Sequence, residues 1–351
     1  MSVLNFCVSI VLSAICFIFA VTTNGSLLHA APVAQSTVVN AIRDRGFVLC
    51  GVRDGLPGFS VVNKNGLWSG LDVDFCAALA AAVLGSKEKV KYRPLSNVQS
   101  YKALANGEVD ILTGGAVWTL TRDTELGVRF VGTLFHDGQV FLVRREQAVS
   151  SALELSGTVV CVLKGTRAEQ GVARFFGSRN MRYKLFLKKH WDDLLEAYRD
   201  GECNVLTGDM SVLAAERLRL PGPDQHQILP EVVTKEPLGL AVKRGDEVWF
   251  SIVRWTLMAI LEAEELGITS ENVAQFKSSK VPRVQQLLGI GTDQGEPMGM
   301  SQDWAYQVIS QVGNYAEMFE RNLGNGSKFK LERGINSLWN KGGLMYGLPL
   351  R

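Results

Sequence analysis

From about residue 40 onward, short runs rich in apolar residues alternate with segments whose apolar positions recur at helical spacing. Short apolar runs bounded by turn residues are typical of buried strands, and longer periodic segments are typical of helices. Strands that alternate with helices indicate an α/β protein whose mostly parallel sheets are covered by helices. The pattern predicts strands at 47–52, 89–95, 109–114, 158–166 and 203–209, and helices at 71–85, 98–108, 167–177, 191–202 and 210–220.

The alternation of strands and helices restarts near residue 140, so the chain divides into two similar halves. Its 351 residues also exceed what one hydrophobic core usually holds. Two extended segments, 137–146 and 236–247, lie between the halves, and each is predicted to cross from one lobe to the other. Two long amphipathic helices are predicted after them, at 247–267 and 303–324.

The first thirty residues have a different pattern, without any Lys, Arg, Asp or Glu. An apolar run at 3–21 is followed by a short polar stretch and by small residues, which predicts a secretory signal peptide at 1–30, cleaved near residue 30. The run lacks basic residues before it and approaches the length that spans a bilayer, so an uncleaved membrane anchor is the alternative.

Composition and charge narrow the class of protein. The chain has 46% apolar residues, 21% charged residues and a net charge of +2, without a stripe of Lys and Arg, so we expect no nucleic-acid partner. Beyond the leader four cysteines remain, an even number that suggests disulfides in an exported chain and leaves three pairings open. There is no C-x-x-C and the histidines lack metal-ligand spacing, so no metal or cofactor is expected. The four cysteines are Cys50, Cys76, Cys161 and Cys203.

Three glycine-containing loops follow predicted strands, at 114–122, 165–167 and 208–209. Ligands of open α/β sheets bind beyond the carboxyl ends of strands, where glycines allow close approach and helix starts offer free amides. The planar fork of Arg122 suits a carboxylate and the charge of Asp209 suits an ammonium, so these loops predict a socket for a zwitterion. Each residue also has a simpler interpretation: Arg122 as a solvated helix start, Asp209 as a helix cap and the glycines as turns.

Six segments of the chain, spread between about residue 40 and residue 351, together form a recognisable set. The set resembles the periplasmic solute-binding proteins of polar amino-acid ABC transporters, and most closely their general L-amino-acid-binding subgroup. The long C-terminal segment is its most specific part. The segments are GVRDGLPGFS (51–60), GLWSGLDVDFCAALAAAV (66–83), WTLTRDTELG (118–127), SALELSGTVVCVLKGT (151–166), LPEVVTKEPLGLAV (229–242) and the tail at 312–351.

The resemblance implies a two-lobed, type II periplasmic-binding-protein fold that closes on its ligand by a hinge motion. Each lobe would be a mostly parallel sheet flanked by helices, with two crossover strands between the lobes. We expect the first part of lobe 1 at 31–137, lobe 2 at 138–237, the return to lobe 1 at 238–280, and a C-terminal extension at 281–351 packed on lobe 1.

The same resemblance assigns an anchoring pair for the ligand. Arg122 corresponds to the arginine that holds the ligand carboxylate, and Asp209 corresponds to the carboxylate that holds the α-amino group. Gly115 corresponds to a backbone contact with the ligand.

The positions around this pair differ from the family pattern. Val117 stands where relatives often have a Thr or Ser hydroxyl, and Arg167, just after Thr166, stands where many have Thr. Arg53 stands where many amino-acid binders have Asp, although a shift of one residue would put Asp54 there. The altered contacts put affinity and specificity in doubt. If Arg53 and Arg167 face the cleft, we expect a preference for glutamate or aspartate; otherwise both turn outward to solvent.

Capture of a free L-amino acid and its delivery to the ABC transporter permease of the inner membrane is the function that the resemblance implies. It involves no cofactor, no metal and no catalysis. The alternatives are an enzyme on the same fold, similar to periplasmic cyclohexadienyl dehydratases, and an amino-acid sensor domain. The chain has no Ser-His-Asp spacing and no G-x-G-x-x-G, which argues against an enzyme.

The implied hinge also bears on the cysteines. A bond between the lobes would block closure, so the expected pairs are Cys50–Cys76 in one lobe and Cys161–Cys203 in the other.

Overall fold

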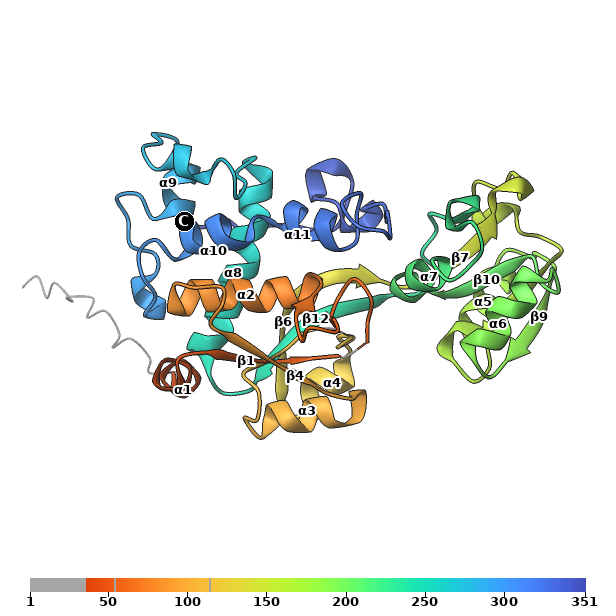
Figure 1. The fold of residues 1–351 in the computed structure, drawn as a ribbon, viewed down its shortest axis with the longest axis horizontal. Coiled ribbons are helices and arrows are strands. Elements are labelled where there is room, and N and C mark those ends of the chain that lie inside the picture. Colours follow the sequence, from red (N-terminus) through yellow and green to blue (C-terminus); the bar gives the residue numbers. More distant parts are fainter. Residues whose placement is uncertain (1–35, 54, 114) are drawn as a thin grey trace, which may run out of the picture. The chain divides into compact units, whose positions relative to one another are not determined.

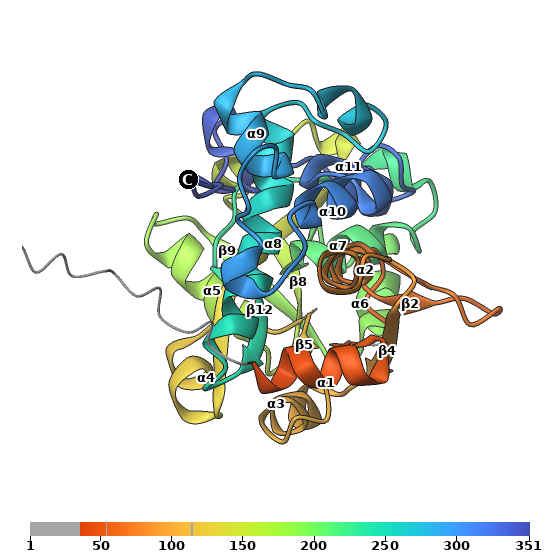
Figure 2. The same cartoon turned by 90° about the vertical axis from the view of Figure 1, so that its left-hand side faces the viewer.

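The computed structural model describes residues 36–53, 55–113 and 115–351 (Figures 1 and 2). It contains two five-stranded sheets with helices packed against them and one small hairpin, which agrees with the two-lobed α/β fold that the sequence predicts. The leader predicted at 1–30 and its cleavage site lie outside the described residues. Among the described residues, no helix combines the length and the apolar character that a bilayer crossing requires.

The first sheet has the strand order β4-β1-β5-β12-β6. Its first three strands are parallel, and the last two pair antiparallel to their neighbours. The strands are β1 (Val48–Val52), β4 (Val90–Pro94), β5 (Ile111–Leu112), β6 (Val128–Asp137) and β12 (Glu236–Lys243). The helices of this half are α1 (Thr37–Arg45), α2 (Leu71–Leu84), α3 (Asn97–Ala105), α4 (Leu120–Glu125) and α8 (Glu247–Glu265), and the hairpin strands are β2 (Val61–Val62) and β3 (Trp68–Ser69).

The second sheet has the order β11-β7-β10-β8-β9, again with three parallel strands and two antiparallel ones. Its strands are β7 (Gln139–Arg144), β8 (Thr158–Leu163), β9 (Tyr183–Lys188), β10 (Val205–Asp209) and β11 (His226–Ile228), and its helices are α5 (Arg167–Gly177), α6 (Trp191–Arg199) and α7 (Met210–Arg217). The hydrophobic pattern gives no prediction for β6 or β9. β9 is an edge strand that is only partly buried along its length, so it lacks a continuous apolar run.

Two crossover segments connect the sheets, and they lie against each other. The chain leaves the first sheet between β6 and β7 at Gly138, where a side chain would collide with the carbonyl oxygen of Thr234 on the returning segment. The amide of Gln139 donates to Thr234 Oγ1 at 3.0 Å, and the amide of Val233 donates to the carbonyl of Gln139 at 2.8 Å. Glycine at position 138 is therefore required by the close approach of the two segments.

The C-terminal helices α9 (Pro282–Leu288), α10 (Trp304–Val312) and α11 (Tyr315–Asn322) complete the first half, and α10 and α11 pack against α2 and α8. The single helix predicted at 303–324 is wrong. Gly313 has φ of 96°, which ends α10, and Asn314 starts α11 with a capping box to Glu317. The helical periodicity continues across this break because both helices bury their apolar faces in the same core.

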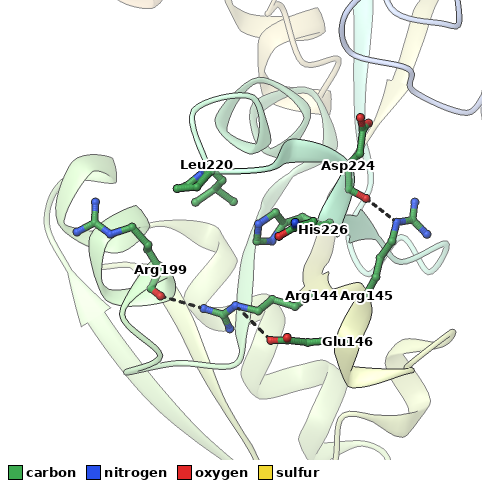
Figure 3. A pocket seen from close by; sticks show the side chains of 9 residues that line it. Arg144, Arg145, Glu146, Arg199, Leu220, Asp224 and His226 are labelled. Atoms are coloured by element: carbon green, nitrogen blue, oxygen red, sulfur yellow. Dashed lines mark hydrogen bonds and ion pairs between the residues drawn. The ribbon is translucent and has the colours of Figure 1, made fainter.

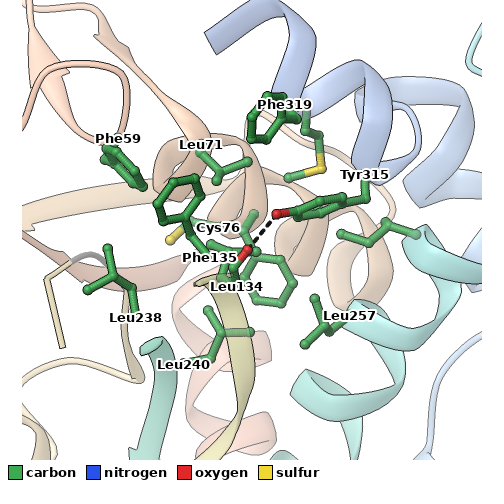
Figure 4. Packing of buried hydrophobic residues seen from close by; sticks show 14 of the residues in the cluster. Phe59, Leu71, Cys76, Leu134, Phe135, Leu238, Leu240, Leu257, Tyr315 and Phe319 are labelled. Carbon is green, nitrogen blue, oxygen red and sulfur yellow. Dashed lines mark hydrogen bonds between the residues drawn. The ribbon is translucent and has the colours of Figure 1, made fainter. Parts of the chain in front are cut away.

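That core brings residues from distant parts of the chain together (Figure 4). The ring of Phe135 on β6 lies 5.0 Å from that of Phe59 and 6.4 Å from that of Phe319, centroid to centroid. The hydroxyl of Tyr315 donates to the carbonyl of Leu134 at 2.8 Å, so the buried polar atom is satisfied. The C-terminal helices are thus joined to β6 just before its crossover.

The two disulfides confirm the predicted pairing. Cys50 of β1 bonds to Cys76 of α2 with Cα atoms 6.2 Å apart, and Cys161 of β8 bonds to Cys203 before β10 with Cα atoms 5.7 Å apart. Both distances lie in the usual range for disulfides. Neither bond connects the two sheets, so neither would restrain their relative movement.

Candidate functional site

A cavity of about 330 Å³ lies at the carboxyl end of β10 and the start of β7, where the second sheet meets the crossovers. The first half of the chain contributes Arg53, which directly follows β1. The two strand ends, the amino end of α5 and the return crossover supply the other walls. The lining residues are Arg53, Gln139, Leu163, Thr166, Arg167, Ala168, Trp191, Thr207, Gly208, Asp209, Val212, Thr234 and Glu236.

Asp209 is the last residue of β10 and the N-cap of α7, but its side chain makes no capping hydrogen bond. The interpretation of Asp209 as a helix cap is therefore wrong at the level of its side chain. Its carboxylate has no hydrogen bond or ion pair with any described residue, and the side chain is open to solvent. The protein around this exposed carboxylate still displaces part of its water, and this partial desolvation raises the pKa of Asp209, while Arg167 and Arg53 oppose the rise. The result is an accessible acidic group ready to receive a cation.

Arg167 faces the cavity and is paired within the protein. Its Nη2 lies 2.9 Å from Oε2 of Glu236, and only 8% of the Glu236 side chain is exposed. Burial raises the pKa of Glu236, with Arg167 and Arg122 opposing the rise and Asp209 adding to it. The sequence left open outward rotation of Arg167 or an anion from the ligand; the side chain is 66% exposed to solvent and yet has an anionic partner within the protein. A carboxylate at the start of β12 supplies the anion instead.

Gln139 and Trp191 are further lining residues that sequence reasoning missed. Gln139 is 1% exposed and donates through Nε2 to Thr207 Oγ1 and to the carbonyl of Ala168, both at 2.9 Å. A Cβ atom at position 208 would lie 2.9 Å from the Trp191 ring, so glycine here leaves room for that ring as one wall of the cavity. Neutral or apolar residues near a crossover carry no signal in a single sequence that distinguishes them from core residues.

Thr166 lines the cavity as the N-cap of α5. Its hydroxyl donates to the carbonyl of Leu163 at 2.7 Å and does not cap the helix. The first amides of α5 therefore have no side-chain cap from Thr166, which is the condition under which a helix start can receive an anion.

Arg122, Gly115 and Val117 lie in the first half of the chain and do not line the 330 Å³ cavity. Arg122 is half-buried, its Nη1 donates to the carbonyl of Val117 at 2.8 Å, and its guanidinium lies 5.5 Å from the centre of the Tyr101 ring. It is therefore a held side chain and not a solvated helix start. Asp54 lies outside the described residues.

Arg53 lies near both the loop before Arg122 and the 330 Å³ cavity. Gly115 has φ of 68°, and a side chain there would come within 2.8 Å of Arg53 Cδ. The glycine thus lets Arg53 lie across the loop before α4. Among the residues that the structure describes, none forms an ion pair with the Arg53 guanidinium or accepts a hydrogen bond from it.

A larger cavity of about 580 Å³ lies elsewhere on the second sheet (Figure 3). Its residues Arg144 and His226 pair across β7 and β11, whereas Asp209 pairs with Gln139 at the other end of β7. β7 has six residues, so its two ends lie ~17 Å apart. The arginines here are already held by protein atoms: Arg145 donates to the carbonyl of Asp224 at 3.0 Å and Arg144 to the carbonyl of Arg199 at 3.4 Å. The greater volume of this cavity therefore does not make it a better candidate for the ligand site than the cavity beside Asp209.

No group of three or more His, Cys, Asp or Glu suited to a metal ion occurs within 36–53, 55–113 or 115–351.

Comparison with known proteins adds independent information. Residues 48–271 match the family model of bacterial extracellular solute-binding proteins, family 3. The chain is 46% identical to the general L-amino acid-binding periplasmic protein AapJ of Rhizobium johnstonii over 93% of this chain and 96% of that protein. It is 42% identical to the glutamate/glutamine/aspartate/asparagine-binding protein BztA of Rhodobacter capsulatus over 93% of this chain and 98% of that protein.

A solved structure agrees with these relatives. An ABC transporter periplasmic binding protein from Brucella ovis with glutathione bound is 44% identical, covers 90% of this chain and all of its own, and superimposes with a TM-score of 0.77. The fold, the family model and relatives that match nearly end to end lead to the same conclusion: the chain belongs to the bacterial extracellular solute-binding proteins of family 3.

Proposed function

We propose that the protein is the substrate-binding component of an ABC transporter for L-amino acids, and that it captures the ligand as a zwitterion at the cavity beside Asp209. The observation that carries the proposal is the accessible Asp209 carboxylate, which is a helix N-cap without a capping bond and has no partner among the described residues. The names of the relatives AapJ and BztA, both amino-acid-binding proteins, support the class of ligand.

In this proposal Asp209 binds the α-ammonium and Arg122 binds the α-carboxylate of the ligand. Gly115 contributes a backbone contact with the ligand, and the carbonyl of Val117 accepts a hydrogen bond that holds the Arg122 guanidinium. Arg122 does not line the cavity that contains Asp209, so both groups meet one ligand only when the halves close on it. Closure requires rotation about the two crossovers, and paired short segments of this kind are typical hinges.

The remaining assignments follow from the same proposal. Thr166 and Arg167 border the ligand at the start of α5, and Arg53 does so after β1. We place lobe 1 at 31–137 and 238–280, lobe 2 at 138–237 and the C-terminal extension at 281–351. The protein acts in the periplasm after cleavage of its leader near residue 30, passes its ligand to the permease subunits, and performs no chemistry.

Calorimetric titration of refolded, ligand-free protein with L-amino acids tests the proposal. Loss of a charged contact in a closed cleft costs roughly 2–5 kcal/mol, so Arg122→Ala and Asp209→Asn should each weaken binding at least about thirtyfold. The matched controls Arg199→Ala and Asp224→Asn alter exposed charges away from the site and should retain the wild-type affinity. Unchanged affinity in Arg122→Ala or Asp209→Asn contradicts the assigned roles.

Native mass spectrometry of the protein as purified, followed by denaturation, tests the class of molecule. Release of a free amino acid supports the proposal. Turnover of prephenate or arogenate by the purified protein would instead identify an enzyme on the same fold.

A further inference from the structure

We propose that this site selects ligands with one net negative charge, and that Arg53 binds the additional anionic group. Such a ligand has an α-ammonium, an α-carboxylate and a second carboxylate on its side chain. The inference rests on the proposed function, because it takes the roles of Asp209 and Arg122 as given.

The first step is the formal charge around the ligand. Three guanidiniums, of Arg53, Arg122 and Arg167, accompany two carboxylates, of Asp209 and Glu236. The described residues of the site therefore carry one excess positive charge. A ligand of net charge −1 neutralises it, whereas a ligand with a cationic side chain adds to it.

Asp137 lies next to this group but does not line the cavity. It is 4% exposed, and its carboxylate accepts hydrogen bonds from the amides of Gly138 at 2.9 Å and Ser211 at 3.2 Å and from the Ser211 hydroxyl. These donors lie within the protein, and burial raises the pKa of this carboxyl group to about 7, so it adds only part of a negative charge near neutral pH.

The second step is the pairing of each charge. Arg167 already has its partner in Glu236 at 2.9 Å. The ammonium and α-carboxylate of the ligand provide partners for Asp209 and Arg122. Arg53 is the cation that remains, because the described chain gives its guanidinium no ion pair and no hydrogen bond.

The third step is the position of Arg53. Its side chain lines the same cavity as Asp209, and its charge opposes the rise in the pKa of that carboxyl group. It also lies over Gly115 in the loop that leads to Arg122. Arg53 therefore lies between the two ends of the proposed zwitterion socket.

The cost of leaving Arg53 unpaired gives the selectivity. A guanidinium that loses water without gaining a partner is strongly destabilised. A neutral side chain on the ligand leaves Arg53 in that state on closure, or forces it outward. An anionic side chain instead forms a charge-assisted pair with it, and discrimination of this kind reaches at least about tenfold.

The test compares ligands of nearly equal shape and different charge. Calorimetry on refolded, ligand-free wild-type protein would measure glutamate against glutamine and aspartate against asparagine. We expect the acid to bind at least about tenfold more tightly in one of the two pairs, with arginine and lysine weaker than either amide. S-methylglutathione, which also has one ammonium and two carboxylates, shows whether the second carboxylate can sit further from the zwitterion.

The variant Arg53→Gln assigns the effect to its residue. It should reduce glutamate affinity far more than glutamine affinity, so that their ratio falls to below about threefold. Arg53 is exposed, so the variant is expected to fold, and its thermal unfolding should match that of the wild type. The control Arg145→Gln removes another exposed arginine near the larger cavity and should keep the wild-type ratio.

The possible failures are distinguishable. Equal affinity for acids and amides in the wild type, or an unchanged ratio in Arg53→Gln, overturns the charge selectivity while amino-acid binding stands. Absence of binding for every amino acid tested overturns the proposed function itself.

Discussion

Replacement of Asn336 by Ala should destabilise the protein through one residue of an edge strand. β6 is the outer strand of its sheet, and His136 on it is opposite Pro237 of β12, which has no N–H to offer. The amide and carbonyl of His136 face away from the sheet and bond to the Asn336 side chain. Oδ1 accepts from the His136 amide at 2.7 Å, and Nδ2 donates to its carbonyl at 3.0 Å.

The expected loss follows from these two bonds. Asn336 has no exposed surface, so water does not reach its side chain in the folded protein. Each hydrogen bond contributes about 1 kcal/mol net, and a buried group left unsatisfied costs about 1–3 kcal/mol. Because His136 is only half-buried, we expect Asn336→Ala to lose about 2–4 kcal/mol of unfolding free energy, a large part of the stability of an ordinary domain.

Urea unfolding followed by tryptophan fluorescence measures this loss, and amide hydrogen exchange of His136 locates it. Asn325→Ala, an exposed position in the same C-terminal segment, is the control and should change stability by less than about 0.5 kcal/mol. A loss of under about 0.5 kcal/mol in Asn336→Ala, or unchanged protection of the His136 amide, would refute this account of how the C-terminal segment supports the crossover strand.

Three further predictions concern other parts of the molecule. Cys161→Ser with Cys203→Ser opens a loop of 42 residues and should cost about 4 kcal/mol on the chain-entropy model, seen as a lower urea midpoint; an unchanged midpoint under non-reducing conditions would contradict this. Burial raises the pKa of Asp137 to about 7 from an ordinary 3.8, so the folded state binds the proton more tightly than the unfolded state. The stabilisation that this protonated carboxyl group gives to the folded state is complete at low pH and is lost as the pH rises through about 7. Asp137→Asn should therefore flatten the decline in stability between about pH 4 and 7, and an unchanged slope would count against this account. Gly115→Ala should cost about 1–2 kcal/mol because φ there is 68°, and it should weaken amino-acid binding by displacing Arg53; full affinity by calorimetry would show that the contact does not matter.

Local rules predicted much of the fold. α5 occupies 167–177 as the pattern predicts, because its buried positions at Gly171, Val172, Phe175 and Phe176 recur at helical spacing. Local rules failed at 303–324, where apolar spacing persisted through Gly313. A glycine and an asparagine with a glutamate three residues later were the available signal for that break.

Local sequence likewise indicated some residues of the candidate site and not others. Arg122 and Asp209 each come after glycine in a loop that follows a predicted strand. The order of residues along the chain therefore indicated both as candidate site residues. Glu236 and Gln139 carry no comparable local mark, and their contacts span 69 and 68 residues of chain. A charged residue at the start of a strand does not reveal whether it faces solvent or the arginine of another element.

The sequence alone therefore determined what depends on neighbouring residues: the alternation of strands and helices, the restart near residue 140 and the loops that bear Arg122 and Asp209. With the hinge implied by the family pattern, it also led to the disulfide pairing. Only the tertiary structure decided how charges are compensated, because contacts between distant segments pair Arg167 with Glu236, whereas the described residues give Arg53 no ion-pair partner. Whether a charged side chain is paired or free depends on which groups the fold brings within a few ångströms of it, and no local pattern records that distance.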